Sequence, residues 1–404
     1  PGRPHSSRPP PRWQRPAARP APPPPRHVPP SAGDTSPRPP AATGSSAGAA
    51  QFQQTELLQG LDLQFRVQLN KAKVPGGAYA VVRGNQIIAT GSYGVRAMGK
   101  PEKIDADTVF RLASVSKTFT GGISVLAAQQ GKVNLDLPLI NYVPEFKLKT
   151  ATATRQIKVD QVLSQSTGLM PHAYENLLEA KQTPEQILPK FQELAPGCKP
   201  GTCYSYQNIV FALLDQVLSR GTGKAYEELL PERIFKPLQM STASVGYAPF
   251  LATENKAMPH KRGGKGWRPV KIDPNFYWVN PAAGVNASVN DMAKYLIAML
   301  GHKPGVFSAE ALAQLQQPMV KLRGKPRWPV WQQFKQVSSW YGRGWRVIQY
   351  DENKLFYHGG VVDGFRPYIA YSPQQDIGLV LLTNAEADIT GDLAKWFWQQ
   401  VLSS

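Results

Sequence analysis

The spacing of apolar residues predicts a folded domain that begins near Gln51. Apolar positions recur at helical intervals over 55–69. Two runs rich in β-branched and apolar residues follow, 78–83 and 86–93, and the Gly84-Asn85 pair between them favours a tight turn. We therefore expect a helix followed by a β-hairpin at the start of the domain.

The rest of the domain is predicted to be helical in the middle and extended at the end. An extended segment over 108–112 precedes a helix over 116–130, and interrupted helical spacing continues over about 135–283. Short apolar runs and a closing helix follow at 345–350, 354–357, 365–371, 377–383 and 393–402. This order predicts one antiparallel sheet that is completed by both ends of the domain, with a helical subdomain inserted.

The first fifty residues have a different composition. Residues 1–50 consist mostly of Pro, Ala, Arg, Ser and Gly and contain almost nothing that could be buried. We interpret them as a disordered tail ahead of one domain over 51–404.

The chain is basic, with 46 Lys and Arg against 28 Asp and Glu and a formal net charge of +18. The tail holds about +6 of this charge, so about +12 belongs to the domain. Because neither zinc-finger spacing nor an RNP-like stretch occurs, we expect no nucleic-acid partner. Solvated surface charge, or work beside an anionic wall or lipid polymer, accounts for the excess. No run of about eighteen apolar residues occurs, so we expect no membrane span.

Cys198 and Cys203 are the two cysteines of the chain, and Pro200-Gly201 between them favours a turn. They form either a small disulfide loop or two unpaired thiols. A disulfide favours an oxidising compartment, and we expect a periplasmic or secreted protein. Two Cys cannot complete a zinc site and the six His are scattered, so we expect neither a metal nor another cofactor.

The first candidate for chemistry is Ser114, which is followed by Lys117 in the pattern Ser-x-x-Lys. Ser114 opens the predicted helix, where free backbone N–H groups and the helix dipole favour a nucleophile. Lys117 lies one turn later on the same face, close enough to reach the hydroxyl. Taken alone, the pattern also fits a helix-capping Ser beside a surface Lys.

Tyr206 and Asn208 form a second candidate pair ahead of an apolar helix. An ammonium group near a Tyr favours its phenolate form, so Tyr206 and Lys117 could share the role of base toward Ser114. Asn208 could face the same cleft and donate to a substrate amide. Alone, the pair also fits a half-buried Tyr and a helix-capping Asn.

The third candidate is the segment His358-Gly359-Gly360 at the end of a predicted strand. Glycine lets a substrate lie against the strand edge, and the N–H of Val361 could then point at a developing oxyanion. His358 would lie over the substrate. A lone His-Gly-Gly also fits a strand end that turns into a loop.

The three motifs, in this order, resemble the active-site regions of class C β-lactamases and their esterase and D-peptidase relatives, in the serine β-lactamase and penicillin-binding-protein superfamily. The segments concerned are 110–121, 200–214 and 358–373. Nearly everything from Gln51 to Leu402 takes part in the resemblance. It implies an α/β (α+β) sandwich with a central antiparallel sheet, flanking helices and an inserted all-helical subdomain, and with the cleft between the sheet and that subdomain.

The resemblance implies acyl transfer, with Ser114 as nucleophile, Lys117 and Tyr206 moving the proton, and the N–H groups of Ser114 and Val361 holding the oxyanion. We expect Asn208, His358 and Gly360 to contact the substrate. His358 stands where class C β-lactamases usually carry Lys. A His at this position is similar to many esterase-like and peptidase-like members of the superfamily.

The expected activity is β-lactam hydrolysis by a monomer that acts on a small molecule. A carboxylesterase and a D-amino-acid peptidase or amidase are the alternatives within the superfamily. A non-enzymatic penicillin-binding sensor, which is acylated and does not turn over, is the alternative outside the enzymes.

Overall fold

The structure is a computed structural model that describes residues 45–403. The chain from Ala50 onward forms one compact unit. Helix α1 (Ser45–Ala72) is longer than predicted, because the Ala- and Gln-rich segment ahead of 55–69 continues the helix. The last six residues of the predicted tail are therefore helical, and its other residues lie outside the described part of the chain.

Thirteen further α-helices follow α1 in the described residues, and most of them are short. No helix within 45–403 is both long and apolar enough to cross a membrane. The helices are α2 (Ser116–Gln129), α3 (Ala151–Gln156), α4 (Val159–Leu163), α5 (Glu175–Glu179), α6 (Pro184–Ile187), α7 (Ile209–Ala212), α8 (Leu214–Thr222), α9 (Tyr226–Leu230), α10 (Tyr247–Ala252), α11 (Asn280–Ala283), α12 (Val289–Met299), α13 (Ala309–Leu315) and α14 (Ile389–Leu402).

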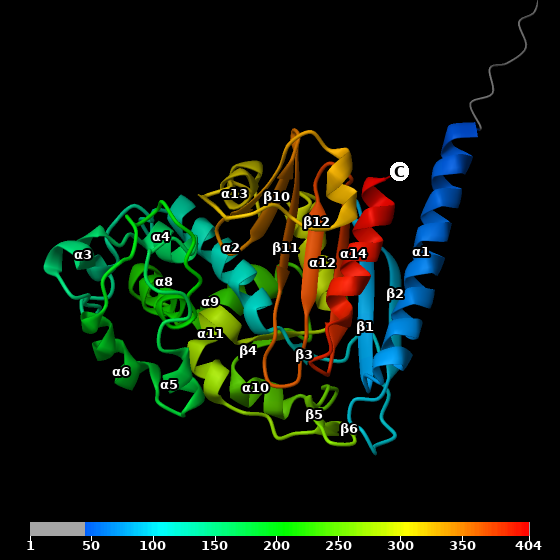
Figure 1. The fold of residues 1–404 in the computed structure, drawn as a ribbon, viewed down its shortest axis with the longest axis horizontal. Coiled ribbons are helices and arrows are strands. Elements are labelled where there is room, and N and C mark those ends of the chain that lie inside the picture. The colour runs from blue at the N-terminus through cyan, green and yellow to red at the C-terminus, as the bar shows by residue number, and fades with distance from the viewer. Residues whose placement is uncertain (1–44, 404) are drawn as a thin grey trace, which may run out of the picture. The chain divides into compact units, whose positions relative to one another are not determined.

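An eight-stranded antiparallel sheet forms the centre of the fold, in the order β2-β1-β13-β12-β11-β10-β9-β8 (Figure 1). The predicted hairpin and the predicted pairing of the two ends of the domain are both confirmed, since β1 pairs with β2 and with β13. The strands are β1 (Gly76–Arg83), β2 (Gln86–Gly94), β8 (Val320–Lys321), β9 (Val337–Tyr341), β10 (Arg346–Tyr350), β11 (Asn353–Gly359), β12 (Tyr368–Ser372) and β13 (Ile377–Thr383).

Helices cover both faces of this sheet. Leu379 and Leu381 of β13 pack in the core shared with α1 and α14, whereas Val380 and Leu382 pack in the core that contains α2 and α12. All seven residues of β13 are buried, because alternate side chains of a strand point to opposite faces. The strand is therefore continuously apolar, as its sequence shows.

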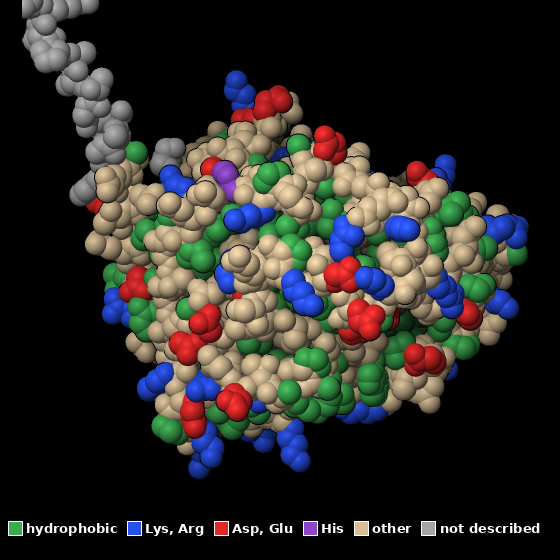
Figure 2. All heavy atoms as spheres, turned by 180° about the vertical axis from the view of Figure 1, so that it is seen from behind, with side chains coloured by type: hydrophobic (Ala, Val, Ile, Leu, Met, Phe, Trp, Pro, Cys, Tyr) green, Lys and Arg blue, Asp and Glu red, His purple; other side chains and the backbone are tan. Residues whose placement is uncertain are grey.

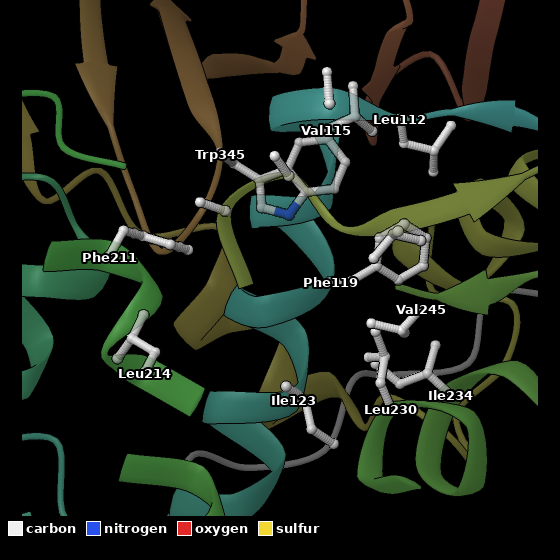
Figure 3. Close-up of a cluster of buried hydrophobic side chains, with 14 of the residues drawn as sticks. Leu112, Val115, Phe119, Ile123, Phe211, Leu214, Leu230, Ile234, Val245 and Trp345 are labelled. Carbon is white, nitrogen blue, oxygen red and sulfur yellow. The ribbon is translucent and has the colours of Figure 1, made fainter. Parts of the chain in front are cut away.

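Helix α2 crosses the core between the sheet and the helical subdomain (Figure 3). Its residues from Ser116 to Ala127 are all buried, and Phe119 stacks on Tyr295 with ring centroids 4.0 Å apart. A Cβ at Gly121 would lie 2.1 Å from the carbonyl oxygen of Arg343, so the helix passes closer to the β9–β10 turn than a side chain would allow. This packing fixes the N-terminus of α2, where the chemistry is expected.

The predicted helical insertion contains short strands as well as helices. A three-stranded sheet, β3-β7-β4, lies beside the start of α2, and β5 pairs with β6 in a separate hairpin. Of these strands, β4, β5 and β6 lie within the predicted insertion, and with two to four residues each they are too short for a visible alternation of apolar and polar positions. β3 lies in the extended segment that was predicted over 108–112, and β7 follows the insertion. These strands are β3 (Phe110–Arg111), β4 (Ser244–Val245), β5 (His260–Gly263), β6 (Gly266–Pro269) and β7 (Val285–Ala287).

The charge of the domain is spread over its surface. On the face shown in Figure 2, Lys and Arg side chains are interspersed with Asp and Glu. This distribution fits solvated surface charge on that face.

Candidate active site

Ser114 lies in a short 3₁₀ turn, Ala113–Val115, directly before α2. Ala113 adopts φ +45°, a left-handed conformation that costs energy for a residue with a Cβ. A Cβ at Gly360 would lie 2.8 Å from the Cβ of Ala113 and 2.9 Å from the backbone nitrogen of Ser114. Only glycine therefore fits at 360, where the chain after β11 passes against the nucleophile.

Lys117 is fully buried on α2, one turn after Ser114. Its Nζ lies 3.3 Å from Ser114 Oγ, 2.5 Å from Asn208 Oδ1 and 3.1 Å from the carbonyl oxygen of Ala282. The predicted Ser–Lys contact is present, and the amine is surrounded by three oxygen atoms.

Burial lowers the pKa of Lys117 well below the usual value of a lysine, because a charged amine loses its hydration there. The carboxylate of Glu175 opposes this effect, and the positive charge of Arg346 adds to it. A lysine with a depressed pKa is populated as a neutral amine at moderate pH. It can then accept the proton of Ser114 as a general base.

Tyr206 lies beside this pair, with Lys117 Nζ 4.7 Å from the centre of its ring. Burial raises the pKa of Tyr206 above its ordinary value, while a hydrogen bond with Ser114 and the charge of Arg346 oppose that effect. The ring is therefore a neutral phenol in this structure, and not the phenolate that the sequence suggested. The buried environment favours Lys117 as the base and Tyr206 as a proton donor.

Asn208 was expected to contact the substrate, but both ends of its amide have other partners. Its Oδ1 accepts from Lys117 at 2.5 Å, and its Nδ2 donates to Glu175 Oε1 at 2.7 Å. Asn208 therefore contacts the base, and since its Nδ2 has a second N–H, its expected contact with the substrate stays a prediction. Glu175 is a residue of the site that sequence reasoning missed. No local motif marks Glu175, because it lies thirty-odd residues before Asn208 in the chain.

His358 lies at the end of β11 and lines the cleft. One ring nitrogen, Nδ1, lies 2.7 Å from the carbonyl oxygen of Gly359, and the other, Nε2, lies 3.1 Å from the hydroxyl of Tyr341. Burial lowers the pKa of His358 well below its usual value, and the charges of Arg346 and Lys117 act in the same direction. These effects disfavour the protonated imidazole, so a charged contact with a substrate carboxylate is not favoured at His358, and its expected contact with the substrate stays a prediction.

Val361 follows Gly360 on the loop after β11. Its side chain is 51% exposed, and its N–H makes no hydrogen bond to any group among residues 45–403. Gly360 is held in place because its N–H donates to the carbonyl of Pro367 at 3.0 Å. A free N–H on a restrained loop beside Ser114 suits an oxyanion, as the motif predicted.

A cavity of about 520 Å³ opens onto Ser114, and its lining includes Tyr206 and the His358-Gly-Gly segment. Arg346, the first residue of β10, also lines it, and sequence reasoning missed this residue. Among the described residues no carboxylate forms an ion pair with Arg346. Its guanidinium carbon instead lies 5.5 to 5.7 Å from the ring centres of Tyr204, Tyr206 and Tyr341.

Comparison with known proteins identifies the family. The family model described as Beta-lactamase matches residues 61–401. This chain belongs to the β-lactamase family. It is 24% identical to Protein flp of Staphylococcus aureus (strain N315) and spans 66% of that protein's length, with 85% of this chain covered. It is 25% identical to a Beta-lactamase of Escherichia coli (strain K12), with 78% of this chain and 85% of that protein covered.

The fold is also similar to that of an octameric penicillin-binding protein homologue from Pyrococcus abyssi. The TM-score is 0.74 at 22% identity, with 86% of this chain and 77% of the homologue covered. The likeness agrees with the predicted β-lactamase-type sandwich. The predicted monomer stays a prediction.

In this β-lactamase-family chain Cys198 and Cys203 form a disulfide, so the first of the two alternatives is confirmed. The closed loop precedes Tyr206 and packs on Gly168, where a Cβ would lie 3.1 Å from Cys198 Sγ. Gln165 holds the same segment, since its Oε1 accepts from the N–H of Gln207 at 2.7 Å. The disulfide and this amide pair together fix the arm that carries the tyrosine.

Proposed function

We propose that the chain hydrolyses β-lactams through an acyl-enzyme on Ser114. The observation that carries the proposal is Arg346, a cation in the cleft that has no carboxylate partner among the described residues. β-Lactams carry a carboxylate next to the amide that is cleaved, and guanidinium groups pair well with carboxylates. A simple ester offers no such group, so this observation favours β-lactams over ester substrates.

The mechanism follows from the proton states of the site. Neutral Lys117 takes the proton of Ser114 as its Oγ attacks the lactam carbonyl, and the N–H groups of Ser114 and Val361 hold the oxyanion. The C–N bond then breaks, and Tyr206 gives its proton to the leaving nitrogen. The proton that Lys117 took from Ser114 passes to the Tyr206 oxygen, which returns both groups to their neutral forms. Water attacks the resulting ester in the same way, which releases the product and regenerates Ser114.

Mass spectrometry of the protein during incubation with a β-lactam tests the proposal. We expect a transient adduct on Ser114 together with the hydrolysed product. A permanent adduct would identify an acyl-trapping sensor instead. No adduct, combined with turnover of a neutral ester, would identify a carboxylesterase and overturn the proposal.

The role of Arg346 can be tested separately with a matched control. Arg346→Gln should raise KM for a β-lactam about 10- to 100-fold, the range of a hydrogen bond between charged groups. Arg366→Gln should have little effect, because Arg366 lines the same cavity but is already paired with Asp388 at 3.1 Å. Equal effects of both changes would show that Arg346 is not the carboxylate contact.

We also propose that the protein works in the periplasm or outside the cell. The disulfide supports this, since such bonds persist in oxidising compartments.

A further inference from the structure

A chain of hydrogen-bonded side chains connects the cleft with the buried base. His172 lines the cleft, and its Nδ1 lies 2.9 Å from Glu175 Oε1 and 3.0 Å from Oε2. Asn208 Nδ2 donates to the same Oε1 at 2.7 Å, and Asn208 Oδ1 accepts from Lys117 at 2.5 Å. Lys117 in turn contacts Ser114. The mechanism above uses only the last two residues of this chain.

The direction of these bonds is set by Glu175. An ionised carboxylate can only accept hydrogen bonds, so the nitrogen end of the Asn208 amide must face it. The oxygen end is then turned toward Lys117. If Glu175 were absent, the amide could rotate and present its NH₂ group to the amine.

The orientation of Asn208 decides where the base points. A neutral amine has two N–H bonds and one lone pair. The oxygens of Asn208 and Ala282 accept the two N–H bonds of Lys117, which leaves the lone pair for Ser114 Oγ at 3.3 Å. An Asn208 that donated to the amine would instead compete with Ser114 for that lone pair.

We propose that Glu175 is a positioning residue for acylation, which holds Asn208 so that the lone pair of Lys117 faces Ser114. The inference rests on the proposed function. His172 restrains the carboxylate from the cleft side, where the Glu175 side chain is 16% and the His172 side chain 57% exposed. An amide does not readily pass protons, so the chain orients and polarises the base and is not a proton wire.

Glu175 also supplies negative charge to this corner of the site. The imidazole of His172 contacts the Glu175 carboxylate, and Glu175 acts on the charge states of Lys117 and Tyr206. Arg346 on β10 also acts on both of these groups, and Tyr204 acts on Tyr206. Lys117 and Arg346 act in turn on His358 at the end of β11. Loss of the carboxylate therefore leaves a cationic neighbourhood. Such a neighbourhood disfavours the protonated form of Lys117.

The test is the pH dependence of Ser114 acylation by a β-lactam in wild type, Glu175→Gln and Glu175→Ala. Acylation needs the neutral amine, so its rate rises with pH through the pKa of Lys117. We expect the plateau rate to fall about 10- to 100-fold in both variants, the range of a hydrogen bond to a charged group. The plateau rate should be lower in Glu175→Ala than in Glu175→Gln. We also expect the rising limb to move to lower pH in both, because the negative charge has gone.

The control is Asp376→Asn, which removes the carboxylate of another His–carboxylate pair, His302 with Asp376 at 2.7 Å, in the turn before β13. It should leave both the plateau and the limb unchanged. A lower plateau with an unmoved limb in Glu175→Gln would assign Glu175 a merely structural role and overturn the inference alone. Failure of wild-type Ser114 to be acylated would overturn the proposed function and this inference with it.

Discussion

Two sides of the site satisfy their polar groups in opposite ways. The helical wall holds Ser114, Lys117 and Tyr206, and the strand wall holds Arg346, His358 and Val361. On the helical wall, Lys117 is fully buried and has three oxygen partners. On the strand wall, Arg346 has no carboxylate partner within the described residues, and the N–H of Val361 makes no hydrogen bond there. The first arrangement suits a base that must not move, and the second leaves donors available to a substrate.

The same contrast helps to explain why two basic residues of the site have different roles. Burial makes the protonated form of Lys117 costly, so its pKa falls and the amine becomes a base. An arginine cannot be deprotonated in a protein, so Arg346 remains a receptor for anions. Burial and side-chain chemistry together therefore separate a catalyst from a binding group.

The largest effect should come from the nucleophile on the helical wall. Ser114→Ala should reduce β-lactam turnover by more than about 10³-fold, because no other group of the site can form the acyl-enzyme. Ser124→Ala is the matched control, since Ser124 is buried on the same helix and its hydroxyl has no hydrogen-bond partner within the described residues. Turnover is measured with thermal unfolding as a check on folding, and a Ser114 variant with wild-type turnover would refute the mechanism.

The next effect concerns the shared proton transfer on the same wall. Lys117→Ala and Tyr206→Phe should each slow acylation by about 10²- to 10⁴-fold, the range of general acid–base catalysis. The double variant should be little slower than the worse single variant, because groups that act as a unit are not additive. Rates from rapid-mixing experiments decide this, and fully additive losses would mean that the two residues act independently.

A smaller effect is expected from the disulfide that holds the arm of Tyr206. Changing Cys198 and Cys203 together to Ser should lower the free energy of unfolding by roughly 2 kcal/mol, as expected for a short loop. Denaturant unfolding measures this. The oxidised wild type treated with a reductant should behave in the same way, and a variant as stable as wild type would show that the Gln165–Gln207 pair is sufficient.

The smallest effect is expected from His358 on the strand wall. Burial lowers the pKa of His358 well below its usual value, so its protonation should give KM no pH dependence in the range where an ordinary histidine loses its charge. KM for a β-lactam and for a neutral ester should therefore follow parallel profiles from about pH 6 to 8. A KM that rises only for the β-lactam across that range would restore His358 as a charged carboxylate contact.

Local signals in the sequence determined much of the frame of this protein. Helical spacing, the Gly84-Asn85 turn and the apolar runs predicted the hairpin, the helix before it, the strands after it, and one sheet completed by both ends of the domain. The Ser-x-x-Lys spacing predicted the contact between Ser114 and Lys117, because residues three apart on a helix share a face. Such signals depend only on neighbours in the chain, so one sequence is sufficient to see them.

The tertiary structure decided what each side chain of the site does. The lowered pKa values of Lys117 and His358 and the raised pKa of Tyr206 all follow from burial, which depends on segments distant in the chain. Arg346 and Glu175 carry no motif and became visible only when β10 and α5 were placed beside Ser114 and Lys117. Desolvation and long-range hydrogen bonds set these roles, and neither is encoded in local periodicity.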